Sequence, residues 1–307
     1  MNNFIKSIIF FIIFIMIIFL ASYLSLNKES VHKYGMYKAS LYQITNEREN
    51  SIDIVAIGDS LVYSSVSPMD IWGETGITSY NGSGPAQTIP ESLKHFEISI
   101  ESQKPKLIFF EANVLFRNPK KKPLSQKLST FFQNAIPIVK YHNNWKNLGY
   151  SKNNNIDFNK GFKYIKDLQK AKNFDYMSEN LISGRIPKGN MAYFNKIVKL
   201  CKDNNVTLVL ISNPSQTSWN NKKHNTTKRI AKEYALDFID MNYQNPLKID
   251  WRKDTRDKGS HLNYAGAKKA SKFLADYLVA TNLFESHKND PAYDEWNRAY
   301  EKFTSND

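Results

Sequence analysis

The sequence predicts an α/β fold with three layers and a central parallel sheet, preceded by one N-terminal transmembrane helix. Short, continuous apolar runs recur along the chain, as expected for parallel strands that are covered on both faces. Segments whose apolar residues recur at helical spacing lie between these runs. The chain has 307 residues, and 41% of them are apolar, so it can bury a substantial core.

The N-terminal helix is predicted from residues 8–26, "IIFFIIFIMIIFLASYLSL", which contain no charged residue. A run of this length can cross a bilayer, and a core helix rarely lacks polar residues for so long. A cleaved signal peptide would have a shorter apolar stretch and a clear small-residue site, so we expect an uncleaved anchor over residues 1–27. Lysines flank both ends and leave the orientation open. Because short anchors usually export a long following domain, we expect a single-pass protein of the cell membrane with its domain outside the cytoplasm.

The remaining elements follow in order after a polar stalk at residues 28–50. Strands are predicted at residues 52–58, 106–114, 207–213 and 236–241, and helices at residues 88–102, 190–204 and 226–236. We assign residues 51–284 to the domain, with a helical insertion at residues 118–190 that includes "GFKYIKDLQKAK" (161–172). Residues 285–307 are predicted to form an amphipathic helix that starts at Asp290 and Pro291.

Composition excludes several classes of function. The net charge of +13 comes without zinc-finger spacing, a phosphate loop or a glycine-aromatic RNA motif, so we predict a solvated basic surface and no nucleic-acid partner. The histidines show no metal-ligand spacing, and we expect neither a metal nor a cofactor. The single cysteine, Cys201, is expected to be a core residue.

A candidate nucleophile, Ser60, follows the first predicted strand in "IGDSL". Ligands of doubly wound folds bind at the carboxyl ends of the strands, which favours a chemical role for this serine. A serine at this position also commonly caps the next helix. A serine hydroxyl needs an imidazole base, and the base gains from a carboxylate that fixes its tautomer.

The segment "RDKGSHLNYAGA" near the C-terminus contains both partners, His261 as the base and Asp257 as its carboxylate. Alone, it would suggest a surface loop before a helix that opens at Asn263. Together with Ser60, it predicts a catalytic triad. Asp254 is the alternative to Asp257.

The segments "GDSL" (58–61) and "HLNYAGA" (261–267) resemble the SGNH, or GDSL, hydrolase superfamily over about residues 52–282. This resemblance implies the three-layer SGNH-hydrolase-like fold and an oxyanion hole formed by Ser60, Gly84 and Asn113. Gly82 competes with Gly84. The chain departs from the family pattern where Glu111 and Ala112 replace the glycine before the asparagine, and where Lys258 stands at the usual position of the acid.

A finer resemblance joins the N-terminal anchor with "IGDSLVYSSVSP", "YNGSGPAQTIPESL" and "GSHLNYAGAKKAS". Together they are similar to accessory proteins that esterify exopolysaccharides or cell-wall glycans. This implies a membrane-bound O-acyltransferase, polysaccharide synthase or export machinery and a glycan polymer as partners. The implied reaction is O-acetyl transfer through an acyl-serine, with the acetyl donor supplied by a partner or an acyl substrate. An esterase and a non-catalytic polymer-binding scaffold are the alternatives.

Overall fold

The computed structural model describes residues 3–24, 43–118 and 158–305, which belong to two separate units. The first unit contains helix α1 (Asn3–Leu24), whose large apolar side chains are exposed, with Phe10 64% exposed. Among the residues described, no helix meets the length and apolar character required to cross a membrane. The second unit contains all the elements discussed below.

The second unit is built on a sheet whose five described strands are all parallel, in the order β2-β1-β3-β4-β5. The strands are β1 (Ile54–Gly58), β2 (Ser79–Ser83), β3 (Leu107–Glu111), β4 (Thr207–Ser212) and β5 (Asp237–Asp240). The prediction of an α/β fold with a central parallel sheet is confirmed.

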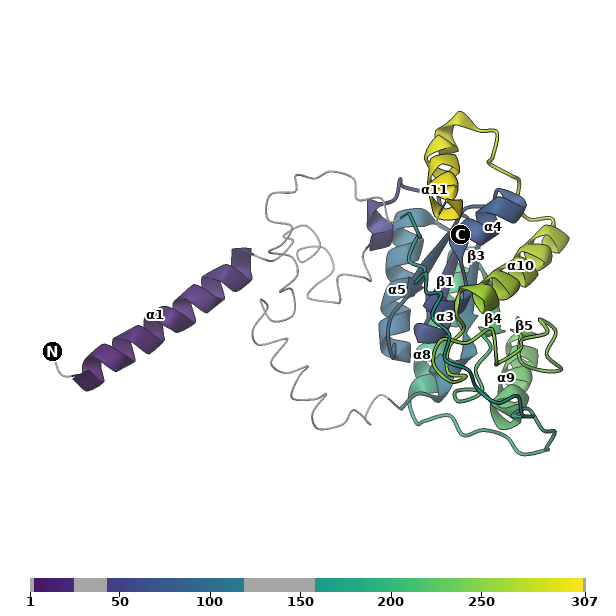
Figure 1. Ribbon diagram of the computed structural model, residues 1–307, viewed down its shortest axis with the longest axis horizontal. Helices are drawn as coiled ribbons and strands as arrows, with labels where there is room; N and C mark the ends of the chain where they lie inside the picture. The colour runs from purple at the N-terminus through teal and green to yellow at the C-terminus, as the bar shows by residue number, and fades with distance from the viewer. Residues whose placement is uncertain (1–2, 25–42, 119–157, 306–307) are drawn as a thin grey trace. The chain divides into compact units, whose positions relative to one another are not determined.

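Helices cover both faces of the sheet (Figure 1). One face carries α5 (Ile89–Gln103), α8 (Asn190–Asp203) and α9 (Asn221–Tyr234). The other carries α3 (Ser60–Ser65), α4 (Pro68–Thr75) and α10 (Tyr264–Thr281), with α11 (Asp294–Thr304) packed on α4. Adjacent residues of β3 supply both cores, because successive side chains of a strand point to opposite faces. Phe110 packs between Phe96 and Phe194, with ring centroids 5.5 and 6.3 Å away, while Phe109 faces Tyr277 at 6.1 Å.

Two strand predictions differ from the structure. β2 was not predicted, because its sequence, SYNGS, is polar; it forms at the sheet edge by pairing with β1 alone. The predicted strand at residues 106–114 ends at Glu111 and continues as the 3-10 helix η3 (Ala112–Phe116). The Glu111 carboxylate accepts the Asn113 N–H at 3.0 Å, which caps that turn.

Helix starts follow local capping. The Glu91 carboxylate accepts the Thr88 N–H at 2.7 Å at the start of α5, and the Asn263 side chain accepts the Gly266 N–H at 3.2 Å at the start of α10. Asp290 caps a short 3-10 turn, η5 (Pro291–Tyr293), that leads into α11. Trp296 of α11 packs on Trp72 of α4 with ring centroids 5.3 Å apart.

The predicted helical insertion is wrong where it can be compared. Residues 119–157 lie outside the described residues, and residues 161–188, which we call the strap, contain no helix. The strap is extended because its backbone bonds to distant segments. The Lys163 N–H donates to the Tyr63 carbonyl, and the Ala171 N–H to the Trp251 carbonyl, both at 2.9 Å. These tertiary bonds outweigh the helical spacing of its apolar residues.

The predicted stalk also differs at its C-terminal end. Residues 43–46 form the 3-10 helix η2 (Gln43–Asn46), and Ile44 is only 1% exposed. The Gln103 side chain of α5 donates to the Ile44 carbonyl at 3.2 Å and accepts the Ser51 N–H at 3.1 Å. The packed domain therefore includes residues that we assigned to the stalk.

Candidate active site

Ser60 lies where β1 turns into α3, and two side chains pack closely against Gly58 at this turn. A Cβ added to Gly58 would lie 2.4 Å from the Glu111 Cβ and 2.5 Å from a Val62 methyl carbon, so the turn needs glycine. Asp59 is the N-cap of α3, since its carboxylate accepts the Leu61 N–H at 2.9 Å. The Ser60 hydroxyl is therefore not the cap of the helix and remains available for another partner.

That partner is His261, whose Nε2 lies 2.8 Å from the Ser60 Oγ. On the other side of the ring, His261 Nδ1 bonds to the Asp257 carboxylate, and Asp257 also accepts the His261 N–H at 2.7 Å. The structure thus brings the three predicted triad residues together. An imidazole held in this way can take a proton from the serine and return it to a leaving group.

The loop between Asp257 and His261 explains how an acid four residues before the histidine reaches it. Lys258 and Gly259 both have left-handed backbones, with φ of 60° and 91°, and the loop that they form turns back so that the Asp257 carboxylate bonds to His261. A Cβ on Gly259 would lie 2.3 Å from the Gln216 Oε1. The alternative acid, Asp254, points elsewhere, because its carboxylate binds Lys269 Nζ at 2.5 Å and the Asp250 N–H at 2.8 Å.

Asn113 is the predicted side-chain donor to an oxyanion. Its Nδ2, its Oδ1 and its backbone N–H each form a hydrogen bond within the protein. Its Nδ2 donates to Asp59 Oδ2 at 3.0 Å, and its Oδ1 accepts from Lys223 Nζ at 2.8 Å. Its backbone N–H donates to Glu111. Because a primary amide has two N–H donors, one remains for a ligand.

Gly84 and Gly82, the two glycines predicted as alternative N–H donors to an oxyanion, both lie where the backbone is already paired. The Gly84 N–H donates to the Gly58 carbonyl at 3.3 Å, and Gly82 lies inside β2 opposite Ile57. The Ser60 amide stands at the first position of α3, where helices leave N–H groups without intrahelical partners. Of the predicted oxyanion hole, Ser60 and Asn113 are thus the donors that the geometry favours. The Gly84 amide is engaged with Gly58 in this arrangement.

Several charged residues around this site were missed by the sequence analysis. Glu111 is fully buried and accepts both the N–H of Asn113 and the side-chain amide of Asn213, the latter at 2.7 Å. Burial, together with the nearby Asp59, raises the pKa of Glu111 to about 8. Asp59 also pairs with Arg117, whose Nε lies 2.7 Å from the Asp59 Oδ2. The available signal was an acid at the carboxyl end of each of two apolar strands, because Asp59 directly follows β1 and Glu111 is the last residue of β3.

Lys223 had no such signal in the sequence. It reaches Asn113 from α9 and also donates to the Ser218 carbonyl at 2.5 Å. Burial, and secondly the positive charge of Arg117, lowers the pKa of the Lys223 ammonium. Lys223 Nζ is thus a hydrogen-bond donor in the interior of the site, next to the candidate oxyanion donor.

Within residues 3–24, 43–118 and 158–305, no group of three or more histidine, cysteine, aspartate or glutamate residues could hold a metal ion. Cys201 is 2% exposed, and burial raises the pKa of its thiol to about 12, which keeps the thiol protonated at neutral pH.

Comparisons with known proteins give matches among solved structures only. No family model matches the chain, and no curated protein matches it. A GDSL-like lipase from Bacteroides thetaiotaomicron is 12% identical, with a TM-score of 0.40, and the match covers 84% of this chain and 98% of that one. A lipase/acylhydrolase from Enterococcus faecalis is 12% identical, with a TM-score of 0.39, covering 75% and 97%.

A third structure, a catalytic mutant of an acetylxylan esterase from Geobacillus stearothermophilus, is 13% identical, with a TM-score of 0.37, covering 77% of this chain and 96% of that one. Values this low assign neither a family nor an activity. The candidate site therefore stands on its own geometry.

Proposed function

We propose that this chain is a serine-dependent acyl-transferring enzyme of the SGNH type, with Ser60 as nucleophile, His261 as base and Asp257 as the orienting acid. The observation that carries the proposal is the chain of contacts from Ser60 Oγ through both ring nitrogens of His261 to Asp257. An isolated serine or histidine has many structural roles. A serine, an imidazole and a carboxylate joined in this order form the arrangement that activates a weak hydroxyl nucleophile.

The first half of the reaction forms an acyl-serine. Ser60 Oγ attacks the carbonyl carbon of an ester while its proton moves to His261 Nε2. The negative charge that develops on the carbonyl oxygen is stabilised by the Ser60 N–H and the remaining N–H of Asn113. The ester C–O bond then breaks, and the leaving alkoxide takes the proton from His261.

The second half transfers the acyl group. An acceptor hydroxyl gives its proton to His261 Nε2 and attacks the acyl-serine, and the departing Ser60 oxygen regains that proton. With a sugar hydroxyl as acceptor, the product is an O-acyl glycan. With water, it is a free acid, and the protein is an esterase. These steps need no cofactor.

We further propose the transferase version, in which the protein is anchored in the cell membrane and its domain lies outside the cytoplasm. There it would esterify an exopolysaccharide or wall glycan beside a membrane-bound O-acyltransferase and polysaccharide synthase or export machinery. The uncharged run at residues 8–26 and the sequence resemblance support this proposal. A non-catalytic scaffold is disfavoured because it would have no need for the Ser60 to His261 contact.

The full chain, purified in detergent, should react with a fluorophosphonate probe that labels activated serines. Ser60→Ala should remove labelling and hydrolysis of p-nitrophenyl acetate while leaving the circular dichroism spectrum unchanged. His261→Gln should lower the hydrolysis rate by several powers of ten. His224→Gln is the matched control, because His224 also bonds through Nδ1 to a carboxylate, Asp240, at 2.7 Å.

Persistent labelling of Ser60→Ala, or equal losses in the two histidine variants, would remove the triad as the reacting site. Mass spectrometry of an oligosaccharide incubated with the aryl acetate then separates the two reactions. An acetylated oligosaccharide indicates transfer, and free acetate alone indicates an esterase.

A further inference from the structure

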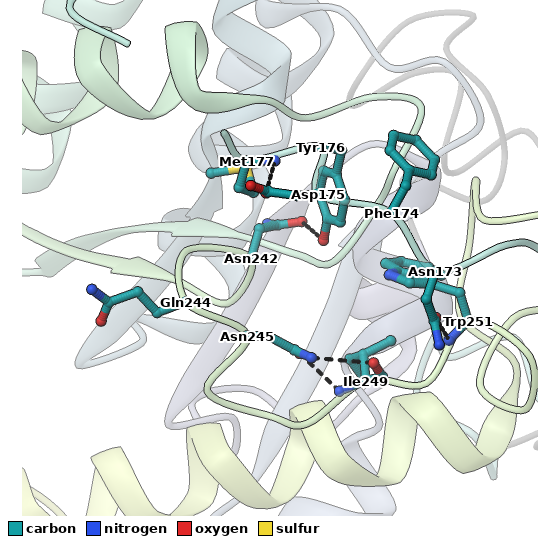
Figure 2. Close-up of a pocket in the computed structure, with 10 residues that line it drawn as sticks. All are labelled: Asn173, Phe174, Asp175, Tyr176, Met177, Asn242, Gln244, Asn245, Ile249 and Trp251. Atoms are coloured by element: carbon teal, nitrogen blue, oxygen red, sulfur yellow. Dashed lines mark hydrogen bonds between the residues drawn. The ribbon is translucent and has the colours of Figure 1, made fainter. Parts of the chain in front are cut away.

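A second candidate site lies apart from the triad, in a cavity of about 470 Å³ between the strap and the loop after β5 (Figure 2). None of Ser60, His261 and Asp257 lines it. We propose that this cavity binds neutral pyranose units of a glycan acceptor, an inference that rests on the acyl-transfer function proposed above. Its volume is in the range of pockets that hold small organic ligands.

Aromatic side chains form one side of the cavity. Phe174 is 59% exposed, although a phenyl ring normally avoids water. Tyr176 stands between it and Trp251, with ring centroids 6.1 Å from Phe174 and 5.9 Å from Trp251. Aromatic faces of this kind pack well against the C–H faces of sugar rings, because those faces are apolar while the hydroxyl groups point outward.

Amide groups form the other side, and the protein fixes several of them. Tyr176 donates its hydroxyl proton to Asn242 Oδ1 at 3.0 Å, and Asn245 binds both backbone polar groups of Ile249, at 2.8 and 3.2 Å. Gln244 is exposed, and its side chain makes no hydrogen bond within the described part of the chain. Figure 2 shows Gln244 extended at one end of the cavity, away from the other labelled side chains. The Gln244 amide can both donate and accept, which matches the mixed character of sugar hydroxyls.

The charge of the lining selects among glycans. Among the residues that the structure describes, Asp175 is the one charged residue that lines the cavity, and no lysine or arginine does so, although the chain has a net charge of +13. A uronate or phosphate group placed here would meet a carboxylate and no balancing cation, which is unfavourable at short range. The cavity therefore fits neutral sugars better than anionic polymers.

Hydrogen bonds connect the cavity to the loop that carries the proposed base. Asn242 Oδ1 also accepts the Ser215 N–H at 3.0 Å, and the Ser215 hydroxyl donates to the Ser260 carbonyl at 2.9 Å. Ser260 directly precedes His261. These two bonds join the cavity lining to the residue that precedes the proposed base.

Binding can be measured without catalysis, in the full-length Ser60→Ala protein in detergent. The probes are cellotetraose and chitotetraose, which are neutral, and tetramannuronate, which is anionic. We expect saturation-transfer NMR to detect at least one neutral tetrasaccharide, and its Kd to be at least about tenfold lower than that of tetramannuronate. Phe174→Ala and Gln244→Ala should each raise the Kd of that tetrasaccharide, Phe174→Ala by about tenfold. Tyr193→Ala is the matched control, since Tyr193 is an exposed aromatic residue on α8 (36% exposed) outside the cavity lining, and should leave the Kd unchanged.

The inference is overturned if neither neutral tetrasaccharide binds, if tetramannuronate binds as tightly, or if Phe174→Ala binds like the control. Failure of the acyl-transfer proposal would show separately, as absence of probe labelling at Ser60. The two results are independent because binding is measured in a protein that lacks the nucleophile.

Discussion

Lys223 Nζ lies 2.8 Å from Asn113 Oδ1 and donates a hydrogen bond to it. The Nδ2 of the same Asn113 amide donates to Asp59. Both ends of the amide are thereby fixed before any ligand arrives. An ammonium at the carbonyl end also draws electron density from the amide, which strengthens the remaining N–H as a hydrogen-bond donor. Lys223 is thus a positioning residue for the proposed oxyanion hole.

Lys223→Met should lower kcat for p-nitrophenyl acetate by about tenfold to a hundredfold, with a small change in KM, because the lost interaction acts on the developing oxyanion. Combined with Asn113→Ala, it should cost little more than Asn113→Ala alone, since Lys223 acts through that amide. Lys222→Met, which alters the exposed neighbouring residue, is the control. Additive losses in the double variant would show that Lys223 does not act through Asn113.

We expect the two candidate acids to have different roles, with Asp257 acting in catalysis and Asp254 in stability. Asp257→Asn should lower kcat by up to about 10⁴-fold with little change in Tm, because His261 would lose the group that fixes its tautomer. Asp254→Asn should lower Tm while folded molecules keep most of their kcat, because Asp254 is 2% exposed and pairs with Lys269. Michaelis–Menten kinetics and thermal unfolding on both variants test this, and the opposite pattern would make Asp254 the orienting acid.

Glu111 should make stability depend on pH. Its pKa is raised in the folded protein from 4.5 to about 8, so the folded state holds a proton there that the unfolded chain releases. The stability associated with protonated Glu111 is complete below about pH 4.5 and is lost as the pH rises through about 8. Urea unfolding at about pH 5, 7 and 9 should show wild type losing stability relative to Glu111→Gln over this range. A constant difference between the two would mean that Glu111 stays ionised throughout.

Gly259 should be intolerant of a side chain. Gly259→Ala should lower kcat, because its φ of 91° is left-handed and the new methyl would meet Gln216 Oε1 at 2.3 Å. Adding Gln216→Ala removes the clash but leaves the backbone strain, so activity should return only in part. Gly189→Ala is the control, with a similar φ of 93° and no neighbour within 4 Å of its added Cβ. It should lower Tm without changing kcat.

The anchor prediction can be tested in cells. Protease added to intact, wall-stripped cells should digest the domain of the full-length protein, because the proposed acyl donor and glycan acceptor both lie outside the cytoplasm. N-terminal sequencing of the mature protein should find residues 1–27 still attached. Full protection until lysis would place the domain in the cytoplasm and exclude the export proposal.

Local sequence was sufficient where burial alone determines structure. The apolar runs of β3 and β4 predicted central strands because every residue of β3 and all but the first of β4 are buried. Local sequence was insufficient where contacts with residues far away in the chain determine the structure. β2 depends on Asn81, whose Nδ2 donates to the Val62 and Val66 carbonyls at 3.0 and 2.9 Å, and the strap depends on backbone bonds to other segments.

Some residues of the candidate site were likewise predictable from local sequence, and others were not. Ser60 and His261 lie in short motifs, and Asp257 is close enough in sequence to be proposed with them. The Asp257 carboxylate reaches His261 only because Lys258 has a left-handed backbone. A lysine in the sequence gives no sign of that conformation, since non-glycine residues rarely adopt it. Lys223 is 110 positions from Asn113 and enters the site only through the placement of α9, so no local pattern could predict it.

The proposed nucleophile and base are 201 positions apart: Ser60 begins the helix that follows β1, and His261 comes after β5, the last described strand. During synthesis, Ser60 therefore emerges long before His261. A nascent chain, or any fragment that ends before residue 261, has a serine with no imidazole beside it and only the weak reactivity of a free hydroxyl. The proposed ester chemistry therefore requires the C-terminal segment to have docked, and this cannot happen before residue 261 has been synthesised.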